Sequence, residues 1–403
     1  MDRALRQAFN AAYTPSLYER YTGRLAEMFG GPIPFRLAET PLFIPTALRD
    51  RLSAHAHEIV ERIRDPALIE RMASVVPPEL HVPRRDAVAN CIQVDLAIVR
   101  NDKGELDGRL VELQGFPSLY GFTLFQAETF AELLRELPGF DVPLTPLFGG
   151  IDRERYVSLL RHAIVAGHDP REVILMDLDP PAQKTSPDFT ATRMLLGIDA
   201  VCPTTLEREG RQLFRRVDGK RVPVRRIYNR VVFDELLGKG IRLPFGYTDD
   251  LDVSWIPHPN WYWIWSKYTM PFIDHPAVPR ARLLSELTSI PDDLSQYVLK
   301  PLFSFAGAGV KVDPTRADLD AIADEQRNGW LLQEKITYAP DLLMPDGGGV
   351  KAEVRLMFLR APDEATPRLV INLTRLSRGK MLGVDQNRDL TWVGGSVGLF
   401  APT

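Results

Sequence analysis

The stretch from Val298 to Val312 constrains the fold most, because an apolar strand delivers a lysine to a run of small residues that leads into a second strand. Lys300, at the end of the first strand, would be a fixed cation. Ser304, Gly307 and Gly309 have little or no side chain to keep backbone N–H groups from phosphate oxygens. The hairpin is therefore either a phosphate-binding loop or an ordinary turn, and the segments around it decide between the two.

Further polar residues occur in a set order around this hairpin. Lys267 precedes it, next to the aromatic run from Trp261 to Trp265, which we expect to be interface core. Gln333 and Glu334 end the strand that follows it, and Arg355 lies on a later strand. A strand that begins near Leu369 carries Arg375. A helix is expected near Leu283 to Leu287.

A second hairpin, from Cys91 to Val99 and from Gly108 to Gly115, carries acidic residues. Alternation places Asp95 on the more polar face of a half-buried first strand, and Glu112 and Gln114 on one face of the second. We expect Asp95 and Gln114 to be near cross-strand neighbours, with Glu112 one step diagonal. Two carboxylates and an amide oxygen suit Mg²⁺. The alternative is a solvent-facing hairpin whose acids are merely exposed.

The order of these motifs resembles the ATP-grasp superfamily. The acid-bearing hairpin precedes the lysines, as in the circularly permuted ATP-grasp group, and the chain is similar to the glutathionylspermidine synthase-like amide ligases. The resemblance covers residues 90 to 400 and lies in order and spacing rather than in long identical runs. By this resemblance, the ATP-binding residues are Lys267, Lys300, Ser304, Gly307, Gly309, Gln333 and Glu334. The metal ligands are Asp95, Glu112 and Gln114. Arg355 and Arg375 lie at the reacting end.

Two positions depart from the family pattern. Gln114 stands where the family has asparagine, and the extra methylene moves the amide oxygen by about a bond length, which matters for a cation with a narrow distance range. Gln93 stands where glutathionylspermidine synthases have an arginine that meets the acyl-phosphate. Gln93 therefore puts in doubt that this chain acts on the same acid substrate.

Composition narrows the function classes. A chain of 403 residues with 45% hydrophobic and 25% charged residues is typical of a globular enzyme of two or three packed units. A formal net charge of −4, with basic residues spread along the chain, gives no footprint for nucleic acid. The N-terminus has no signal-peptide pattern and no stretch is long enough to span a membrane, so a cytoplasmic protein is expected. The sequence gives no indication of the oligomeric state.

We expect four parts in the chain. Residues 1–90 read as a helical region on the substrate side, in which Thr46 caps a helix and His55 and His57 point to different sides of it. Residues 91–150 hold the metal hairpin. Residues 151–255 alternate strands and helices, which indicates a small α/β domain with parallel pairing, similar to a pre-ATP-grasp domain. Residues 256–403 form the ATP-binding lobe. The fold class is thus α+β and α/β.

The function implied by the resemblance is an ATP- and Mg²⁺-dependent ligase that joins a carboxylate to an amine through an acyl-phosphate, on a peptide-like or polyamine-like small molecule. Catalysis would come from alignment and charge stabilisation, with no side-chain nucleophile. Two alternatives remain open. The chain is a non-catalytic nucleotide-binding or scaffold protein with the same fold, or it transfers a phosphoryl group to an acceptor that is not a carboxylate.

Overall fold

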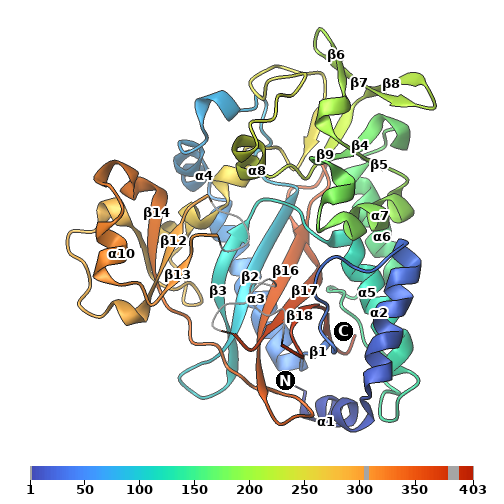
Figure 1. Cartoon of the computed structure of the whole chain (residues 1–403), viewed down its shortest axis with the longest axis vertical. Helices are drawn as coiled ribbons and strands as arrows, with labels where there is room; N and C mark the ends of the chain where they lie inside the picture. The colour runs from blue at the N-terminus through green and yellow to red at the C-terminus, as the bar shows by residue number, and fades with distance from the viewer. Residues whose placement is uncertain (1, 304–307, 380–389, 403) are drawn as a thin grey trace.

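The computed structural model describes residues 2–303, 308–379 and 390–402. Its central feature is an antiparallel sheet in the order β18-β17-β16-β2-β3, with β15 paired to the end of β16 (Figure 1). The strands of this sheet are β2 (Cys91–Arg100), β3 (Leu106–Gln114), β15 (Leu342–Leu343), β16 (Gly349–Leu359), β17 (Arg368–Ser377) and β18 (Gly394–Ser396). The sheet thus joins the early hairpin to four strands from the last quarter of the chain.

The early hairpin forms as predicted, but its register and its burial differ from the prediction. Asp95 pairs directly with Glu112, and Gln114 pairs with Gln93. The register shifts between Asp95 and Leu96, which changes the facing residues along the rest of the hairpin. Residues 91–99 are all buried, because β16 occupies the other edge of β2. The prediction of a half-buried strand was wrong, and so is the alternative of a solvent-facing hairpin.

Helices dominate the first 90 residues, as predicted. They are α1 (Arg3–Ala12), α2 (Pro15–Phe29), α3 (Thr46–Ile63) and α4 (Pro66–Ala73). Pro45, not Thr46, is the N-cap of α3, so the predicted cap is one residue late. The apolar face of α3 is buried and packs on β3, where Leu52 lies against Gly108. Because Leu96 contacts the same spot and side chains alternate, Asp95 points to the opposite face of the sheet.

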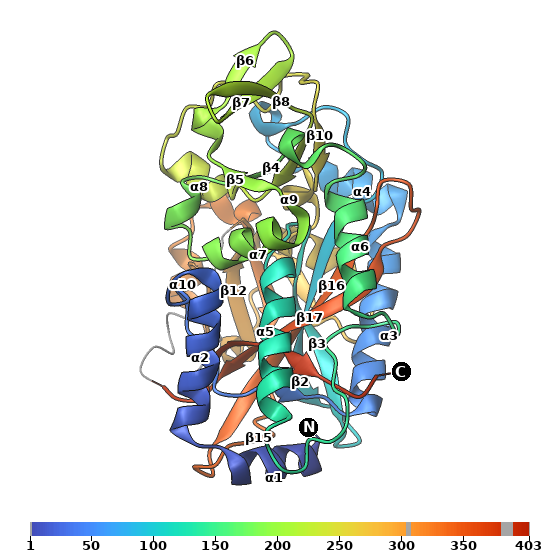
Figure 2. The ribbon, with the colours of Figure 1, turned by 90° about the vertical axis from the view of Figure 1, so that its right-hand side faces the viewer.

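Helix α5 (Tyr120–Leu134) crosses the sheet with α2 beside it (Figure 2). It is anchored at its start, where the Tyr120 hydroxyl donates a hydrogen bond of 2.7 Å to the Phe358 carbonyl of β16. Asp188 accepts hydrogen bonds from the backbone N–H groups of Leu119, Gly121 and Phe122 at 2.9 to 3.0 Å. This carboxylate fixes the loop that connects β3 to α5.

A second sheet, in the order β10-β9-β4-β5, is parallel throughout, as the alternating pattern predicted. Its elements are β4 (Val173–Met176), β5 (Asp199–Val201), β9 (Arg226–Asn229) and β10 (Ser254–Ile256), with helices α6 (Arg153–Ile164), α7 (Ser186–Leu196) and α8 (Phe233–Gly238). A small sheet of β6 (Glu207–Glu209), β7 (Gln212–Val217) and β8 (Lys220–Val224) projects from it. Asp218 and Gly219 form its predicted turn with φ of 49° and 74°.

The third sheet, in the order β11-β14-β12-β13, forms a separate lobe (Figure 1). It comprises β11 (Ala281–Leu283), β12 (Tyr297–Pro301), β13 (Lys311–Val312) and β14 (Trp330–Glu334), with helix α10 (Arg316–Asp320). The helix predicted near Leu283 to Leu287 is present only as a short 3₁₀ helix. Strand β11 occupies its start because it pairs with β14, and a 3₁₀ turn (Leu284–Glu286) follows. The lobe has its own small apolar core of Leu284, Leu299, Leu319, Ile322 and Leu332.

The two ends of the chain meet. Strand β1 (Leu42–Phe43) pairs in parallel with β19 (Gly398–Leu399). Elsewhere, the short helix α9 (Trp261–Ile264) precedes the third sheet in the chain. One continuous apolar core underlies the first two sheets. The division of the chain into four parts stays a prediction. Among the helices that the structure describes, none combines the length and the apolar character that crossing a membrane requires.

Candidate functional site

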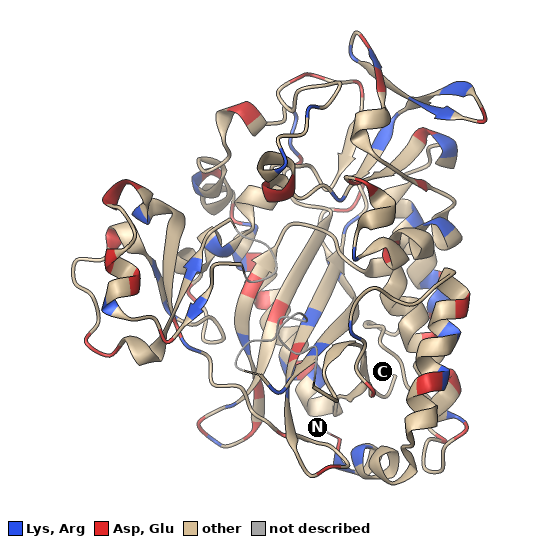
Figure 3. Ribbon diagram, in the orientation of Figure 1, with Lys and Arg blue, Asp and Glu red and all other residues tan. Residues whose placement is uncertain are grey.

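A row of charged side chains crosses the central sheet. Arg355 on β16 is in register with Asp95 on β2, which is in register with Glu112 on β3. Two residues along β16, Glu353 is in register with Arg375 on β17. Figure 3 shows charged segments on these strands in the middle of the molecule as well as on the outer helices. Strand alternation therefore gathers these charges on the face of the sheet opposite to α3.

Asp95 is held by two arginines. Nε and Nη2 of Arg355 each donate to a different Asp95 oxygen at 2.6 Å, and Nη2 of Arg375 also contacts the carboxylate. Arg375 reaches Glu353 as well, at 2.5 Å. Asp95 is fully buried and has lost its contacts with water. The guanidinium groups donate the hydrogen bonds that water would otherwise provide. A metal at Asp95, which stays a prediction, would have to share these oxygens.

Glu112 and Gln114 lie beside this ion-pair cluster. Nε2 of Gln114 donates to Oε1 of Glu112 at 2.6 Å. Burial acts to raise the pKa of Glu112, but the nearby cations, led by Lys267 and Arg375, outweigh it and leave the pKa below its ordinary value. Glu112 is therefore ionised at neutral pH. Its carboxylate lines the cavity described below, as does the Gln114 amide.

Glu353 is a site residue that the sequence reasoning missed. Its carboxylate accepts a hydrogen bond of 3.1 Å from the Tyr338 hydroxyl and pairs with Arg375. Burial raises the pKa of Glu353; Arg375 opposes the rise, while the charges of Asp95 and Glu112 add to it. The signal was present in the sequence, because Glu353 is two residues from Arg355 and must share its face of the strand.

Lys300 is brought from the third sheet to the edge of β3. Its Nζ donates to Oε1 of Gln333 at 3.0 Å and to the Val111 carbonyl of β3 at 3.2 Å. Burial lowers the pKa of Lys300 to about 8, although Glu112 acts against this. Burial also lowers the pKa of Lys267, again opposed by Glu112. Two buried ammonium groups near one carboxylate form a strong site for anionic oxygen atoms.

Lys267 is positioned by a close backbone approach. The Gly115 N–H donates to the Trp265 carbonyl at 3.0 Å, and a Cβ at Gly115 would lie 2.4 Å from the Trp261 carbonyl oxygen. Only glycine fits there. Ser266 then caps the 3₁₀ turn that begins at Lys267, by accepting from the Tyr268 N–H. Trp261 and Trp265 are fully buried, so the aromatic run is core, as predicted.

The two residues assigned to the adenine hinge end β14. Gln333 is buried and holds Lys300. Oε2 of Glu334 accepts from the Arg280 N–H at 3.2 Å, and the Glu334 N–H donates to the Arg280 carbonyl at 2.8 Å. Gly309 adopts φ of 73° in the β12–β13 turn. Ser304 and Gly307, predicted in the same loop, lie outside the described residues.

One cavity of about 1140 Å³ joins these groups. Of the predicted site residues, eight line it: Glu112, Gln114, Lys267, Lys300, Gln333, Glu334, Arg355 and Arg375. Asp95 lies beneath the cavity floor, behind the two arginines. Glu353, Tyr338, Lys351 and Lys184, which were not predicted, also line the cavity. The structure thus gathers acids, lysines and arginines from three distant chain segments around one space.

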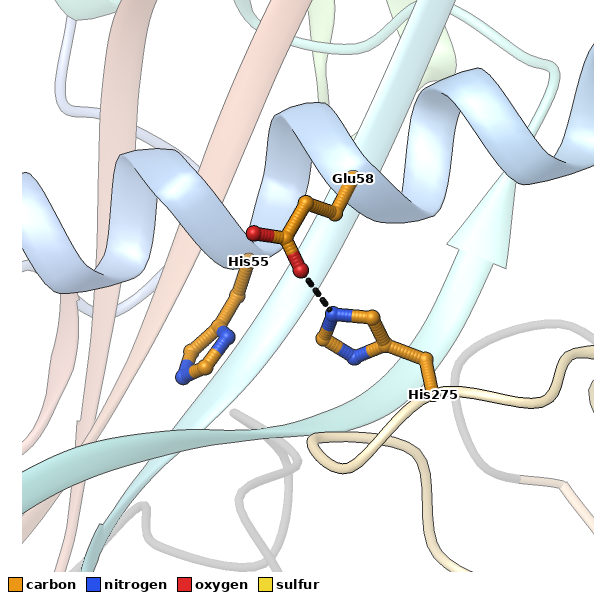
Figure 4. Close-up of side chains that lie close together, drawn as sticks. All are labelled: His55, Glu58 and His275. Atoms are coloured by element: carbon orange, nitrogen blue, oxygen red, sulfur yellow. Dashed lines mark hydrogen bonds and ion pairs between the residues drawn. The ribbon is translucent and has the colours of Figure 1, made fainter.

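A second polar cluster lies near α3, on the other face of the sheet. Nε2 of His275 is 2.7 Å from Oε2 of Glu58, with His55 beside this pair (Figure 4). Nε2 of His55 is 2.8 Å from Oδ1 of Asp107. Nδ1 of His275 accepts from the Ala277 N–H at 3.0 Å, so a neutral ring carries its proton on Nε2 and donates it to Glu58. Both His275 nitrogens are therefore satisfied without a metal. His57 has other partners than His55: its Nδ1 is 2.7 Å from the Ser53 carbonyl and its ring packs on Phe358.

Comparison with known proteins informs the fold alone. No protein-family model matches the chain, and no curated protein matches it. Among solved structures, it is similar to a glutathione synthetase-like effector from Globodera pallida in its apo form, with a TM-score of 0.60, 14% sequence identity, and coverage of 91% of this chain and 96% of that one. The mixed α/β fold thus resembles that of a glutathione synthetase-like effector.

Proposed function

We propose that the protein is an ATP- and Mg²⁺-dependent ligase that joins a carboxylate to an amine through an acyl-phosphate. One observation carries the proposal: a single cavity holds two buried lysines, two arginines and ionised Glu112, in a fold that resembles a glutathione synthetase-like ATP-grasp structure. This combination suits a triphosphate and the negative charge that grows during phosphoryl transfer. In this proposal the chain is a circularly permuted ATP-grasp protein, since the acid-bearing hairpin precedes both lysines.

In this proposal the nucleotide lies between the third sheet and the edge of β3. Lys300 and Lys267 bind phosphate oxygens, and Gln333 and Glu334 border the base. The lowered pKa values of both lysines support this role, because an incoming phosphate relieves the unfavourable burial of each ammonium. The β12–β13 turn with Gly309, Ser304 and Gly307 is the proposed phosphate loop.

Glu112 and Gln114 are the proposed magnesium ligands. The donor set fits, because a half-buried carboxylate and an amide face the cavity and Mg²⁺ takes oxygen ligands. Gln114 now presents its nitrogen to Glu112, so ligation requires the amide to turn and present its oxygen. Bound Mg²⁺ would neutralise phosphate charge. Glu353 is a further candidate ligand, and Asp95 would act chiefly by holding Arg355 and Arg375.

The chemistry then follows from the arginines. A substrate carboxylate oxygen forms a bond to the γ-phosphorus as the bond to the β,γ-bridging oxygen breaks and ADP leaves. Arg355 and Arg375 stabilise the charge on the transferred group, and their pairing with Asp95 fixes their planes. The amine then attacks the acyl carbon, loses a proton, and phosphate departs. The protein supplies alignment and electrostatic stabilisation rather than a nucleophile.

The second candidate is a nucleotide-binding protein without catalysis. Its specific support is the engagement of Asp95 by two guanidinium groups, which competes with a metal at that carboxylate. Gln93 replaces the family arginine with a neutral amide, which is buried and donates to the Ser118 carbonyl at 2.9 Å. Phosphoryl transfer to another acceptor is the third possibility.

Calorimetry with ATP and Mg²⁺ tests the proposal. Lys300→Ala should weaken ATP binding by about tenfold to a hundredfold, the range for hydrogen bonds to a charged group. Lys311→Ala is the matched control, because Lys311 lies on the same hairpin but is exposed and pairs with Asp318. Equal affinity in wild type and Lys300→Ala would contradict the site. Release of ADP and phosphate only when both co-substrates are present would identify a ligase. A phosphorylated product would identify a kinase. Nucleotide binding without turnover would identify the non-catalytic protein.

A further inference from the structure

We propose that the carboxylate substrate is a hydrophobic acid, with an alkyl or aryl body, and that this body lies against an apolar wall of the cavity. The inference rests on the proposed function and names its substrate class. The wall is formed by Ile33, Pro34, Phe35, Phe116, Leu119 and Phe122, all of which line the cavity. They come from the segment after α2, from the loop that leads into α5 and, for Phe122, from the first turn of α5 itself.

The wall lies directly beside the reacting end of the site. Gly395 on β18 is in register with Arg375. A Cβ at Gly395 would lie 3.6 Å from Cε2 of Phe35, so the Phe35 ring packs on this glycine. The Phe35 and Phe122 rings meet edge to face, with centroids 5.5 Å apart. A carboxylate placed at Arg375 would therefore extend its substituent over these two rings.

A separate apolar region accounts for the nucleotide base. It belongs to the third sheet and its margins, and consists of Val298, Leu302, Val310, Val312 and Ile336. This region adjoins the predicted hinge at Gln333 and Glu334, whereas the wall is built by the N-terminal region and the α5 loop. The charged groups of β3, β16 and β17 belong to neither region. The cavity thus has two apolar parts, and only one is needed by ATP.

The polar groups next to the wall are already bonded within the protein. Arg36 contacts the Tyr18 hydroxyl, the Leu37 carbonyl and Glu39. Gln126 donates to the Tyr21 hydroxyl at 2.8 Å. Lys184, at the exposed rim, also has an interaction of its own within the protein.

If the acid carried a second charged group, that group would lose its hydration against these rings. The polar side chains nearby could not compensate, because they already bond other groups of the protein. An unpaired charge is costly to bury, whereas an apolar body gains from leaving water. The wall therefore selects a monocarboxylate with an apolar body over a dicarboxylate or a charged peptide.

Hydroxylamine trapping tests the inference, because hydroxylamine takes the place of the amine and converts an acyl-phosphate into a stable hydroxamate. The full-length protein is given ATP, Mg²⁺ and either 3-phenylpropanoate or glutarate. The expected result is at least about tenfold more hydroxamate from 3-phenylpropanoate, the scale on which apolar pockets discriminate. A preference for glutarate would overturn the inference.

Variants locate the effect. Phe35→Asp and, independently, Ile33→Asp should each lower the affinity for 3-phenylpropanoate by about tenfold while ATP affinity is unchanged. Met194→Asp, an apolar-to-acid change on the exposed face of α7, should leave both affinities unchanged. Unchanged 3-phenylpropanoate affinity in both folded wall variants would also overturn the inference.

Direct calorimetry with 3-phenylpropanoate separates this inference from the proposed function. If the acid binds, and binds more weakly to both wall variants, but no hydroxamate forms, then the apolar site stands and the ligase reaction fails. If ATP binds but the acid does not bind with or without ATP, then the apolar site is wrong and the nucleotide site stands.

Discussion

Arg355 and Asp95 face each other across β16 and β2, with two parallel hydrogen bonds of 2.6 Å between the guanidinium group and the carboxylate. Both residues are buried, and they are 260 positions apart in sequence. The pair therefore joins the early hairpin to the C-terminal strands and sets the orientation of an arginine that lines the cavity. A fork-to-fork contact of this kind fixes direction as well as distance.

Neutralising Asp95 should destabilise the fold strongly. In Asp95→Asn, buried Arg355 and partly exposed Arg375 lose the carboxylate that they share. Breaking a buried ion pair such as Arg355–Asp95 in this way costs about 3 to 5 kcal/mol. Urea unfolding followed by circular dichroism measures the loss. Asp346→Asn is the matched control, since Asp346 makes a similar two-bond contact with Arg378 at the surface. That change should cost about 1 kcal/mol or less. Equal effects of the two changes would contradict the importance assigned to the buried pair.

ATP affinity should fall as the pH rises through about 8. Burial sets the pKa of Lys300 near this value, so the ammonium is present below it and lost above it. Phosphate binding favours the charged form, and the affinity is therefore highest on the acid side of the transition. Calorimetry at pH 7 and pH 9.5 measures the change. Lys300→Ala should show a shallower dependence, to which Lys267 still contributes. A profile identical to that of the wild type would show that Lys300 does not meet the nucleotide.

Removing the charge of Glu112 should remove most of the Mg²⁺ dependence of ATP binding. Glu112→Gln keeps the shape of the side chain but offers Mg²⁺ a neutral ligand in place of a carboxylate. ATP titrations with and without Mg²⁺ should then differ less than they do for the wild type. Asp107→Asn is the control, because Asp107 lies on the same strand and bonds His55 near α3. Full Mg²⁺ dependence in Glu112→Gln would place the metal elsewhere.

Adding a single methyl group at Gly115 should disturb both the fold and the site. The new Cβ would lie 2.4 Å from the Trp261 carbonyl oxygen, so β3 or the turn that carries Lys267 must move. Overpacking of this kind costs about 1 to 3 kcal/mol. Thermal unfolding and ATP calorimetry on Gly115→Ala measure the two effects. Gly23→Ala in α2, with open space around the new atom, should instead be neutral or stabilising by up to about 1 kcal/mol. A Gly115→Ala protein as stable as the wild type would contradict the close approach.

Side-chain alternation was enough to predict the strands of the hairpin, because side-chain periodicity is a local property. The succession of strands and helices along residues 151–255 was enough to predict the parallel sheet. Alternation did not give the register, since the shift between Asp95 and Leu96 depends on how the strands fit their neighbours. The burial of β2 was missed for a related reason. Strand β16 pairs with its second edge, and the sequence near residue 95 does not indicate a partner 260 positions away.

The candidate site was predictable where one residue type in one strand suffices, as for Lys300 and Arg355. Glu353 could have been found by applying the same alternation once more to β16. The engagement of Asp95 by Arg355 and Arg375 could not, because it requires three strands to be placed first. The need for glycine at position 115 is equally hidden, because it arises from a backbone contact with a segment far along the chain.

The placement of β2 between β3 and β16 also bears on how the chain is made. During synthesis the hairpin emerges early, but the guanidinium groups that Asp95 requires emerge some 260 residues later. Until then, one edge of β2 is unpaired and the Asp95 carboxylate has no partner. Such a delay slows folding and exposes the chain to aggregation. The parallel pairing of β1 with β19 extends the delay to residue 399. Folding of the central sheet is therefore expected to begin only after β16, β17 and β18 have been synthesised.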